Sequence, residues 1–198
     1  MKKSQLIYQY IREQGAVSKQ DIVIGLGLSL PTITQNLNNL AELGLIDTSK
    51  KISNTGGRNA TAYSYIEKAR YAVGLYLNRH HINCVAVDLS GNVISLIRVR
   101  ENFDLNDDNY LRKIGETVEE VKKDTGLSDD RFLGVGIAVQ GLISDDGERV
   151  TYGLTLNFTG VTRADIAKYI PYHNRLFHDS AAAGYAEVWD RNDLDDAF

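Results

Sequence analysis

Apolar residues recur in the first third of the chain at spacings of three and four, which is the repeat of an amphipathic helix. The repeat predicts a helix over about 4–14 and two shorter helices within 18–46. Ser18 and Ser29 stand where the two shorter helices begin, and their hydroxyls can accept the free backbone N–H groups there. A glycine-rich turn separates the pair. Two short helices joined by a tight turn are typical of a DNA-reading unit.

The second helix of this pair has a surface that carries no charge. Its apolar positions form one stripe for burial, and no charged residue occurs from Leu30 to Ala41. The other positions hold amides and hydroxyls, which form hydrogen bonds with base edges. The side chains predicted to contact DNA are Ser29, Thr32, Gln35, Asn36 and Asn39, whereas Thr34 and Asn38 are expected to contact only the DNA backbone or the hairpin that follows.

A β-hairpin is predicted directly after this helix. Apolar Ile46 begins one strand, and the alternating residues 61–65 form its return partner. The connection between them contains Lys50 and Lys51 and then the sequence Gly-Gly-Arg58. Two glycines let a backbone turn close to a phosphate. The two lysines are therefore predicted to grip the DNA backbone, and Arg58 to enter a minor groove, in the manner of a winged helix-turn-helix.

Charge is divided unevenly along the chain. Residues 1–66 contain seven Lys and Arg against four Asp and Glu, a net charge of +3. The rest of the chain carries −7, so the total is −4. The basic end is the expected DNA-binding end. The alternative interpretation is an ordinary corner of a helical bundle, because short helical pairs with a glycine turn also occur in proteins that bind no DNA.

The hydrophobic pattern changes from helical to strand-like near residue 68. A continuous apolar run in this part is typical of a strand that is covered on both faces. The expected elements are strands over 71–77, 82–89 and 93–100, a helix over about 107–125, a strand over 132–139, a helix near 162–169, a short strand over 175–177 and a helix over about 180–189. This order describes half of an actin-like, ribonuclease H-like fold. We therefore predict an α/β protein with domains 1–68 and 69–198.

Composition fits a two-domain protein of the cytoplasm. The chain has 198 residues, of which 43% are hydrophobic, so it can form a core beyond its first domain. There is no apolar run of ~18 residues and no signal-like start, so neither a membrane span nor secretion is expected. Cys84 is single, which excludes an internal disulfide and favours a reducing compartment. No metal site is predicted, because the histidines lack ligand spacing, and no cofactor is expected.

Four stretches of the second domain resemble the amino-terminal half of ROK-family proteins, the group named for repressors, open reading frames and kinases. They are Tyr71–Leu77 with Val87–Val93, Gly134–Ile143 and Phe177–Glu187. A helix-turn-helix followed by an actin-like lobe is the layout of the family's repressors. The resemblance covers essentially the whole chain. It implies a sugar-responsive repressor of a carbohydrate-use operon that binds double-stranded operator DNA as a homodimer or larger homo-oligomer.

The resemblance also bears on catalysis. The family's sugar kinases carry an Asp followed by a Gly-Gly-Thr turn at the first hairpin, where a phosphate needs close backbone approach. This chain has Tyr76 and the sequence Asn78-Arg79-His80 at those positions. The larger side chains would crowd a phosphate, and the carboxylate is absent. The chain is therefore predicted not to be an enzyme.

A sugar-binding site is a further implication of the resemblance. Asp179 matches the family's catalytic Asp, whose carboxylate can bind a sugar hydroxyl in a repressor; the alternative is that it caps the helix that follows. His178 and Ala181 replace two asparagines of the family. The residues implied to contact sugar are Gln140, Gly141, Asn157, His178 and Asp179, with turn formation as the alternative for the first three.

The chain stops where the family begins its second lobe, which also holds the family's zinc ligands, so the expected fold has the second lobe absent and only half of a sugar cleft. Two alternatives to a sugar-responsive repressor stay open. One is a ROK sugar kinase with an added DNA-binding domain. The other is a DNA-binding module whose lobe serves for dimerisation and binds no ligand.

Overall fold

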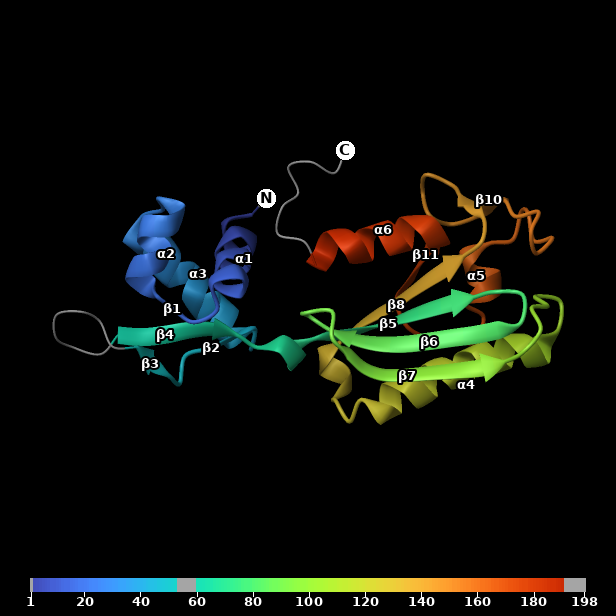
Figure 1. The fold of residues 1–198 in the computed structure, drawn as a ribbon, viewed down its shortest axis with the longest axis horizontal. Helices are drawn as coiled ribbons and strands as arrows, with labels where there is room; N and C mark the ends of the chain where they lie inside the picture. Colours follow the sequence, from blue (N-terminus) through green and yellow to red (C-terminus); the bar gives the residue numbers. More distant parts are fainter. Residues whose placement is uncertain (1, 53–59, 191–198) are drawn as a thin grey trace. The chain divides into compact units, whose positions relative to one another are not determined.

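The computed structural model of the chain describes residues 2–52 and 60–190 (Figure 1). The chain divides into two compact units, residues 1–69 and 70–198. We refer to them as the N-terminal unit and the C-terminal unit and describe each by itself.

The described part of the N-terminal unit consists of three helices, with one short strand between the first two and the other strands after the third. The elements are α1 (Lys3–Gln14), β1 (Val17–Ser18), α2 (Lys19–Leu26), α3 (Leu30–Glu42), β2 (Ile46–Asp47), β3 (Lys51–Ile52), β4 (Ala60–Tyr65) and a 3₁₀ turn over Glu67–Ala69. Strand β4 is the centre of the sheet, because β1, β2 and β3 all pair with it in antiparallel register. The predicted hairpin strands are present, whereas β1 and β3 were not predicted; two-residue strands are too short to show an alternating pattern.

Both predicted helix caps are confirmed. The Ser18 Oγ accepts the Asp21 N–H at 3.2 Å, and an Asp21 carboxylate oxygen accepts the Ser18 N–H at 2.8 Å, which completes a capping box at the start of α2. The Ser29 Oγ accepts the Thr32 N–H at 3.5 Å at the start of α3. Between these caps, Gly27 adopts a left-handed conformation with a φ of 61°, which ends α2 and sets the tight turn.

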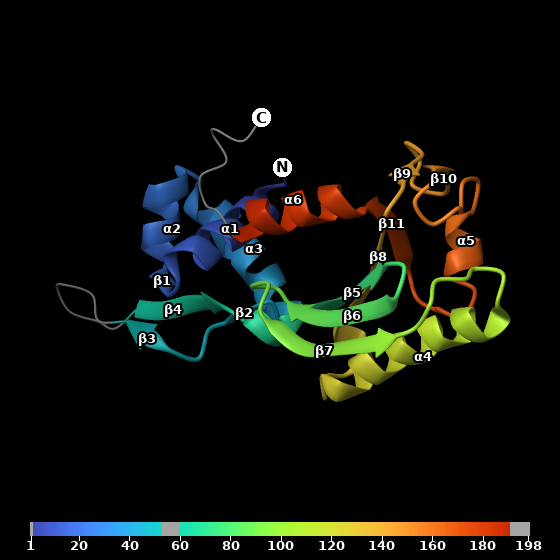
Figure 2. The same ribbon diagram turned by 45° about the vertical axis from the view of Figure 1, so that its right-hand side comes forward.

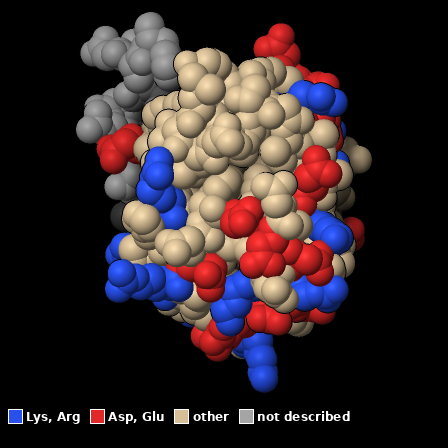
Figure 3. Space-filling model, turned by 90° about the vertical axis from the view of Figure 1, so that its right-hand side faces the viewer, with Lys and Arg blue, Asp and Glu red and all other residues tan. Residues whose placement is uncertain are grey.

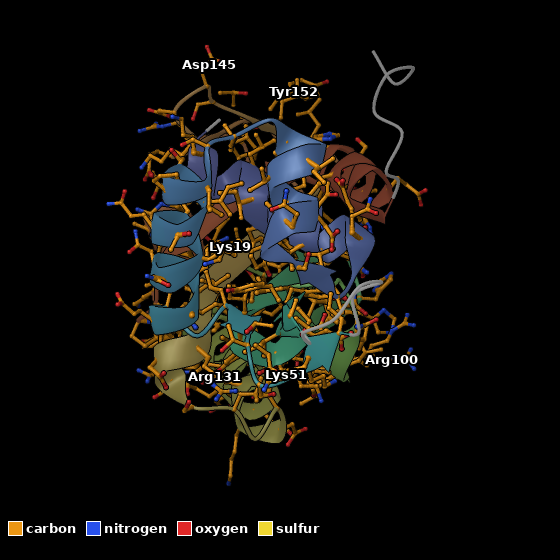
Figure 4. The ribbon with its side chains drawn as sticks, turned by 90° about the vertical axis from the view of Figure 1, so that its left-hand side faces the viewer. Lys19, Lys51, Arg100, Arg131, Asp145 and Tyr152 are labelled. Atoms are coloured by element: carbon orange, nitrogen blue, oxygen red, sulfur yellow. The ribbon has the colours of Figure 1, made fainter. Side chains whose placement is uncertain are left out.

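A small apolar core holds the three helices together. The predicted stripe of α3 is buried and meets residues of α1, α2, β1 and β2. The buried members are Ile7, Ile11, Val17, Ile22, Ile33, Leu37, Leu40 and Ile46. The side of α3 that faces away from this core is consequently available to solvent (Figure 4).

The C-terminal unit is built on a mixed sheet with the strand order β11-β8-β5-β6-β7 (Figure 1). Strands β5, β6 and β7 form an antiparallel meander, while β8 runs parallel to both β5 and β11. The elements are β5 (Tyr71–Leu77), β6 (His81–Asp88), β7 (Val93–Arg100), α4 (Asp108–Asp124), a 3₁₀ turn over Asp129–Arg131, β8 (Phe132–Val139), β9 (Leu142–Ile143), β10 (Val150–Tyr152), α5 (Arg163–Ile166), β11 (Asn174–His178) and α6 (Asp179–Asp190).

Two helices lie on opposite faces of this sheet (Figure 2). Helix α4 covers β5, β6 and β7, and its buried residues Ile114, Val118 and Val121 pack against the strands. Helix α6 packs on the other face, against β8 and β11. The loop that follows the carboxyl end of β8 lies next to the start of α6.

The predicted helix near 162–169 is wrong in length. Helix α5 ends at Ile166, because the Ile170 N–H bonds to the Ala167 carbonyl in a turn and Tyr169 is drawn toward α4. The Tyr169 hydroxyl donates to the Asp108 carboxylate at 2.8 Å, and the Lys168 Nζ lies 2.6 Å from it. The hydrogen bond from Lys168 and then that from Tyr169 lower the pKa of Asp108 to about 2.

The β9–β10 hairpin was not predicted, since its strands have only two and three residues.

Candidate functional sites

The polar side chains of α3 fall into two sets. Thr32 and Asn36 are partly buried, and they form bonds within the helix itself. The Thr32 Oγ1 lies 2.9 Å from the Ser29 Oγ, and the Asn36 Nδ2 donates to the Thr32 carbonyl at 2.8 Å. Gln35 and Asn39 are instead exposed. The structure therefore directs only part of the predicted DNA-contact set toward solvent.

One exposed amide of α3 was not among the side chains predicted to contact bases. Asn38 follows Gln35 by three positions and precedes Asn39, so all three lie on the side opposite the buried stripe. The exposure of Asn38 follows from helical periodicity once the stripe is known, and that signal could have found it from sequence. Glu42 is exposed at the end of the same helix.

Basic residues lie near the start of α3 and in the hairpin. Lys19 and Gln20, at the beginning of α2, share a shallow pocket of about 290 Å³ with Leu30 and with Thr61 of β4. Lys19 was not among the side chains predicted to contact DNA. Lys50 and Lys51 are exposed, and Lys51 lies in β3, which pairs with β4. Figure 4 labels Lys51 and Lys19. Arg58, the predicted minor-groove residue, lies outside the residues that the structure describes.

The C-terminal unit has an open pocket of about 440 Å³ beyond the carboxyl ends of β8 and β11. Four of the five residues implied to bind sugar line it: Gln140, Gly141, His178 and Asp179. They meet because β8 and β11 are parallel neighbours, with Val139 paired to His178. The rest of the lining comes from the β9–β10 region, namely Leu142, Tyr152, Leu154 and Thr155.

The polar groups of this pocket have distinct partners. The His178 Nδ1 lies 2.6 Å from the Ser180 Oγ, and the Gln140 Nε2 donates to the Tyr76 hydroxyl at 3.1 Å. One oxygen of Asp179 accepts the Ser180 N–H at 2.8 Å, so the carboxylate contacts the start of α6 as the capping alternative expected. The Asp179 side chain is nevertheless 29% exposed and faces the pocket, where its second oxygen can accept a ligand hydroxyl.

Asn157 is not part of the pocket lining. It is exposed, adopts a left-handed φ of 54° and donates its N–H to the Leu154 carbonyl at 3.2 Å. Asparagine tolerates this conformation better than most residues do. Its observed role is therefore that of a turn residue in the loop between β10 and α5.

The surface around the pocket carries little charge. The sequence has no Lys, Arg, Asp or Glu from Val150 to Thr162, and Leu142, Tyr152 and Leu154 are all more than half exposed. Figure 3 shows this side of the molecule as a broad uncharged area, with charged side chains gathered below it. An open, weakly charged pocket with a few polar groups suits a neutral polyhydroxyl ligand better than a phosphorylated one.

The β5–β6 turn is filled by its own side chains. The Asn78 Oδ1 accepts the N–H groups of His80 and His81 at 3.1 and 3.0 Å. The Arg79 Nη2 donates to the Thr155 carbonyl at 2.8 Å, so the turn also holds the loop that forms one wall of the pocket. These bonds occupy the place where the family's kinases are expected to bring backbone close to a phosphate.

Replacing Arg79 with alanine is expected to loosen the loop over residues 153–160. The change removes a charge-assisted hydrogen bond to a backbone carbonyl, so the amides of the loop should exchange with solvent several-fold faster, while those of α4 are unchanged. Hydrogen exchange measured by mass spectrometry tests this. The matched control is His80→Ala, because His80 is exposed in the same turn and contacts Asn102 instead of the loop. Equal exchange in the two variants would contradict this role for Arg79.

Two further observations concern the described residues alone. No helix among them is both long enough and apolar enough to cross a membrane. Nor do any three His, Cys, Asp or Glu side chains within 2–52 and 60–187 come together as metal ligands.

These features define a two-unit protein in which a small helical unit with a polar, uncharged helix face is joined to an α/β unit with an open pocket. No protein-family model matches the chain. It is 23% identical over 167 residues to the DNA-binding transcriptional dual regulator NagC of Escherichia coli K12, and equally to the N-acetylglucosamine repressor of Shigella flexneri. In both cases the match covers 75% of this chain and 36% of the relative.

The fold is also found in a solved structure. A ROK family transcriptional regulator, described as a homologue of the E. coli MLC protein, superimposes with a TM-score of 0.70 and 19% sequence identity. The superposition covers 93% of this chain and 47% of that regulator. The chain thus spans about a third of the curated relatives and about half of the solved regulator. The chain is thus similar in sequence to NagC and in fold to a ROK family transcriptional regulator.

Proposed function

We propose that this chain is a sequence-specific DNA-binding transcriptional regulator of the ROK type, a repressor whose DNA affinity responds to a sugar. In this proposal residues 1–68 form a winged helix-turn-helix and residues 69–198 form an actin-like lobe. The observation that carries the proposal is the exposed face of α3, which holds amides and no charge from residue 30 to residue 41. Both α2 and α3 are capped, and residues 1–66 have a net positive charge. The similarity to NagC, which is named as a DNA-binding regulator, supports it.

DNA binding would begin with the basic residues around α3. Lys19, Lys50 and Lys51 would contact phosphates on either side of the major groove, and α3 would then enter the groove and contact base edges. Two copies in a homodimer would place two such helices on successive major grooves. Phosphate contacts release counterions, so binding would weaken steeply as salt rises.

The pocket of the C-terminal unit would hold the effector. Asp179, His178 and Gln140 offer acceptors and donors for sugar hydroxyls, and the pocket wall from the β9–β10 region would exclude water on one side. A sugar that binds one arrangement of the dimer better than another would shift the spacing of the two DNA-binding units and lower operator affinity.

A phosphoryl-transfer enzyme is the less favoured function. The Asn78 side chain bonds within the β5–β6 turn, and the Arg79 side chain bonds to the loop that contains Thr155. A nucleotide phosphate at this turn would have to displace those bonds.

The test of the DNA-binding half is capture of fragmented DNA from the chain's own gene neighbourhood by the purified protein, at about 50 and about 200 mM salt. The expected result is selective binding to one or a few fragments that is much weaker at the higher salt. Gln35→Ala, a change at an exposed position, should abolish the selectivity without changing thermal stability. Binding of all fragments alike by the wild type would overturn the proposal.

The effector half has a separate readout. A panel of neutral sugars, with N-acetylglucosamine among them, is screened for a rise in melting temperature, because a ligand that binds only the folded state stabilises it. Asp179→Asn should remove the shift caused by an active sugar. If no sugar shifts the wild type, the lobe is a platform for dimerisation instead of a sensor.

A further inference from the structure

We propose that α3 reads A·T base pairs, with Gln35 and Asn38 binding adenine edges and Leu30 packing on a thymine methyl group. The inference rests on the proposed DNA-binding function and deepens it, because it states the chemistry of the DNA site. It also changes which amides matter, since Asn38 replaces Asn36 as a base-contacting residue.

The side-chain amides on α3 differ in whether they form hydrogen bonds within the protein. The Asn36 side chain donates to the Thr32 carbonyl of its own helix and is partly buried. Gln35, Asn38 and Asn39 are exposed, and none of their side chains forms a hydrogen bond with the residues that the structure describes. Positions three and four apart share a helix face, so these three amides can enter one groove together.

The hydrogen-bonding pattern of a side-chain amide matches that of adenine. A side-chain amide has one donor and one acceptor side by side, and adenine presents a donor at N6 next to an acceptor at N7 in the major groove. Guanine presents two acceptors there, which Arg or Lys match best. The sequence from Leu30 to Ala41 contains neither Arg nor Lys. The face of α3 is thus complementary to adenine.

Leu30 provides an apolar side chain at the start of α3. This side chain is 51% exposed at the first residue of α3, beside the pocket that also contains Lys19. A phosphate held by Lys19 would bring the start of α3 against the groove wall. Thymine is the only DNA base with a methyl group in the major groove, and apolar side chains recognise it by contact.

The charge distribution along α3 fixes which end enters the groove. Glu42 is exposed in the last turn, where its carboxylate would repel phosphates. The start of the helix carries the partial positive charge of its free N–H groups and lies next to Lys19. Residues 30–39 are therefore the part of the helix that approaches the bases.

The test uses the fragment captured in the DNA-binding experiment, after its protected bases have been mapped. Each adenine in turn is replaced by purine, which lacks the N6 amine, and each thymine by uracil, which lacks the methyl group. Binding is measured for the wild type, Asn38→Ala and Leu30→Ala, with Asn36→Ala as the matched control. All variants are checked for unchanged thermal stability.

Asn38→Ala is expected to weaken binding by roughly 5- to 150-fold, and to make the protein indifferent to loss of N6 at one particular adenine. Leu30→Ala should make it indifferent to loss of one thymine methyl, and Asn36→Ala should bind as the wild type does. Selective binding that survives Asn38→Ala but fails in Asn36→Ala would overturn the inference and leave the DNA-binding function standing. Absence of any selective fragment would overturn both.

Discussion

Replacing Leu37 with alanine is expected to unfold the N-terminal unit and thereby to abolish the DNA binding that we propose for it. Leu37 is 1% exposed and lies in the middle of α3, in one core cluster with Ile7, Ile11 and Ile33. Loss of a buried leucine side chain costs roughly 2–5 kcal/mol. A single core in a unit of fewer than about 70–80 residues rarely supplies more than roughly 3–5 kcal/mol. One substitution is therefore comparable with the whole stability of this unit.

Hydrogen exchange resolved by segment is the measurement for Leu37→Ala. Protection should be lost in α1, α2 and α3 and kept in β5, β6 and β8, since the two units are separately compact. Leu43→Ala is the control, because Leu43 follows α3 and is 56% exposed. It should change the stability by no more than about 0.5 kcal/mol. Persistent protection of α1 and α3 in Leu37→Ala would show that the core does not hold the unit together.

Replacing Gly115 with alanine is expected to destabilise the C-terminal unit, although alanine is normally the better helix residue. Gly115 lies on the buried side of α4, where a Cβ atom would come within 2.5 Å of the Tyr169 carbonyl oxygen and 2.8 Å of the Tyr169 Cβ. The nearest atom belongs to the backbone, so a change of side-chain rotamer cannot relieve the contact. Either α4 or the segment after α5 must therefore move. Overpacking of this kind costs roughly 1–3 kcal/mol.

Thermal unfolding of Gly115→Ala tests this, with an expected fall in melting temperature of about 3–9 °C. The same exchange at Gly184 in α6 is the matched control, because a Cβ there meets no atom of the described residues within 4 Å. Gly184→Ala should leave the stability unchanged or raise it by up to roughly 1 kcal/mol. Equal melting temperatures for the two variants would mean that α4 and Tyr169 are not in close contact.

Local chemistry accounts for what could be predicted of the fold. Ser18 and Ser29 cap the helices they precede, and β5, β7 and β8 have the residue ranges expected from their apolar patterns. These features depend on residues within a few positions of one another, so a single sequence contains the whole signal. The length of α5 and the β9–β10 hairpin were missed, because contacts with α4 and with the sheet decide them.

The candidate sites could be predicted only in part for a similar reason. The uncharged face of α3 is visible in the sequence. The sequence does not show which of its amides bond within the protein, because only the geometry of the helix shows that the Asn36 side chain donates to the Thr32 carbonyl. Arg79 and Thr155 are far apart in the chain, and no sequence pattern joins them. Four of the five residues implied by the family resemblance line the pocket, whereas Asn157 forms a turn outside it.

The sequence by itself determined the longer helices, the caps at Ser18 and Ser29, most strands of the C-terminal sheet and the uncharged character of α3, since periodicity and capping are local properties. Only the tertiary structure decided which side chains share a surface. His178 and Gln140 line one pocket because β8 and β11 are parallel neighbours. The β5–β6 turn contacts the pocket wall because Arg79 donates a hydrogen bond to the Thr155 carbonyl. Such meetings depend on how distant segments pack, and packing is set by the whole buried core and not by neighbouring residues.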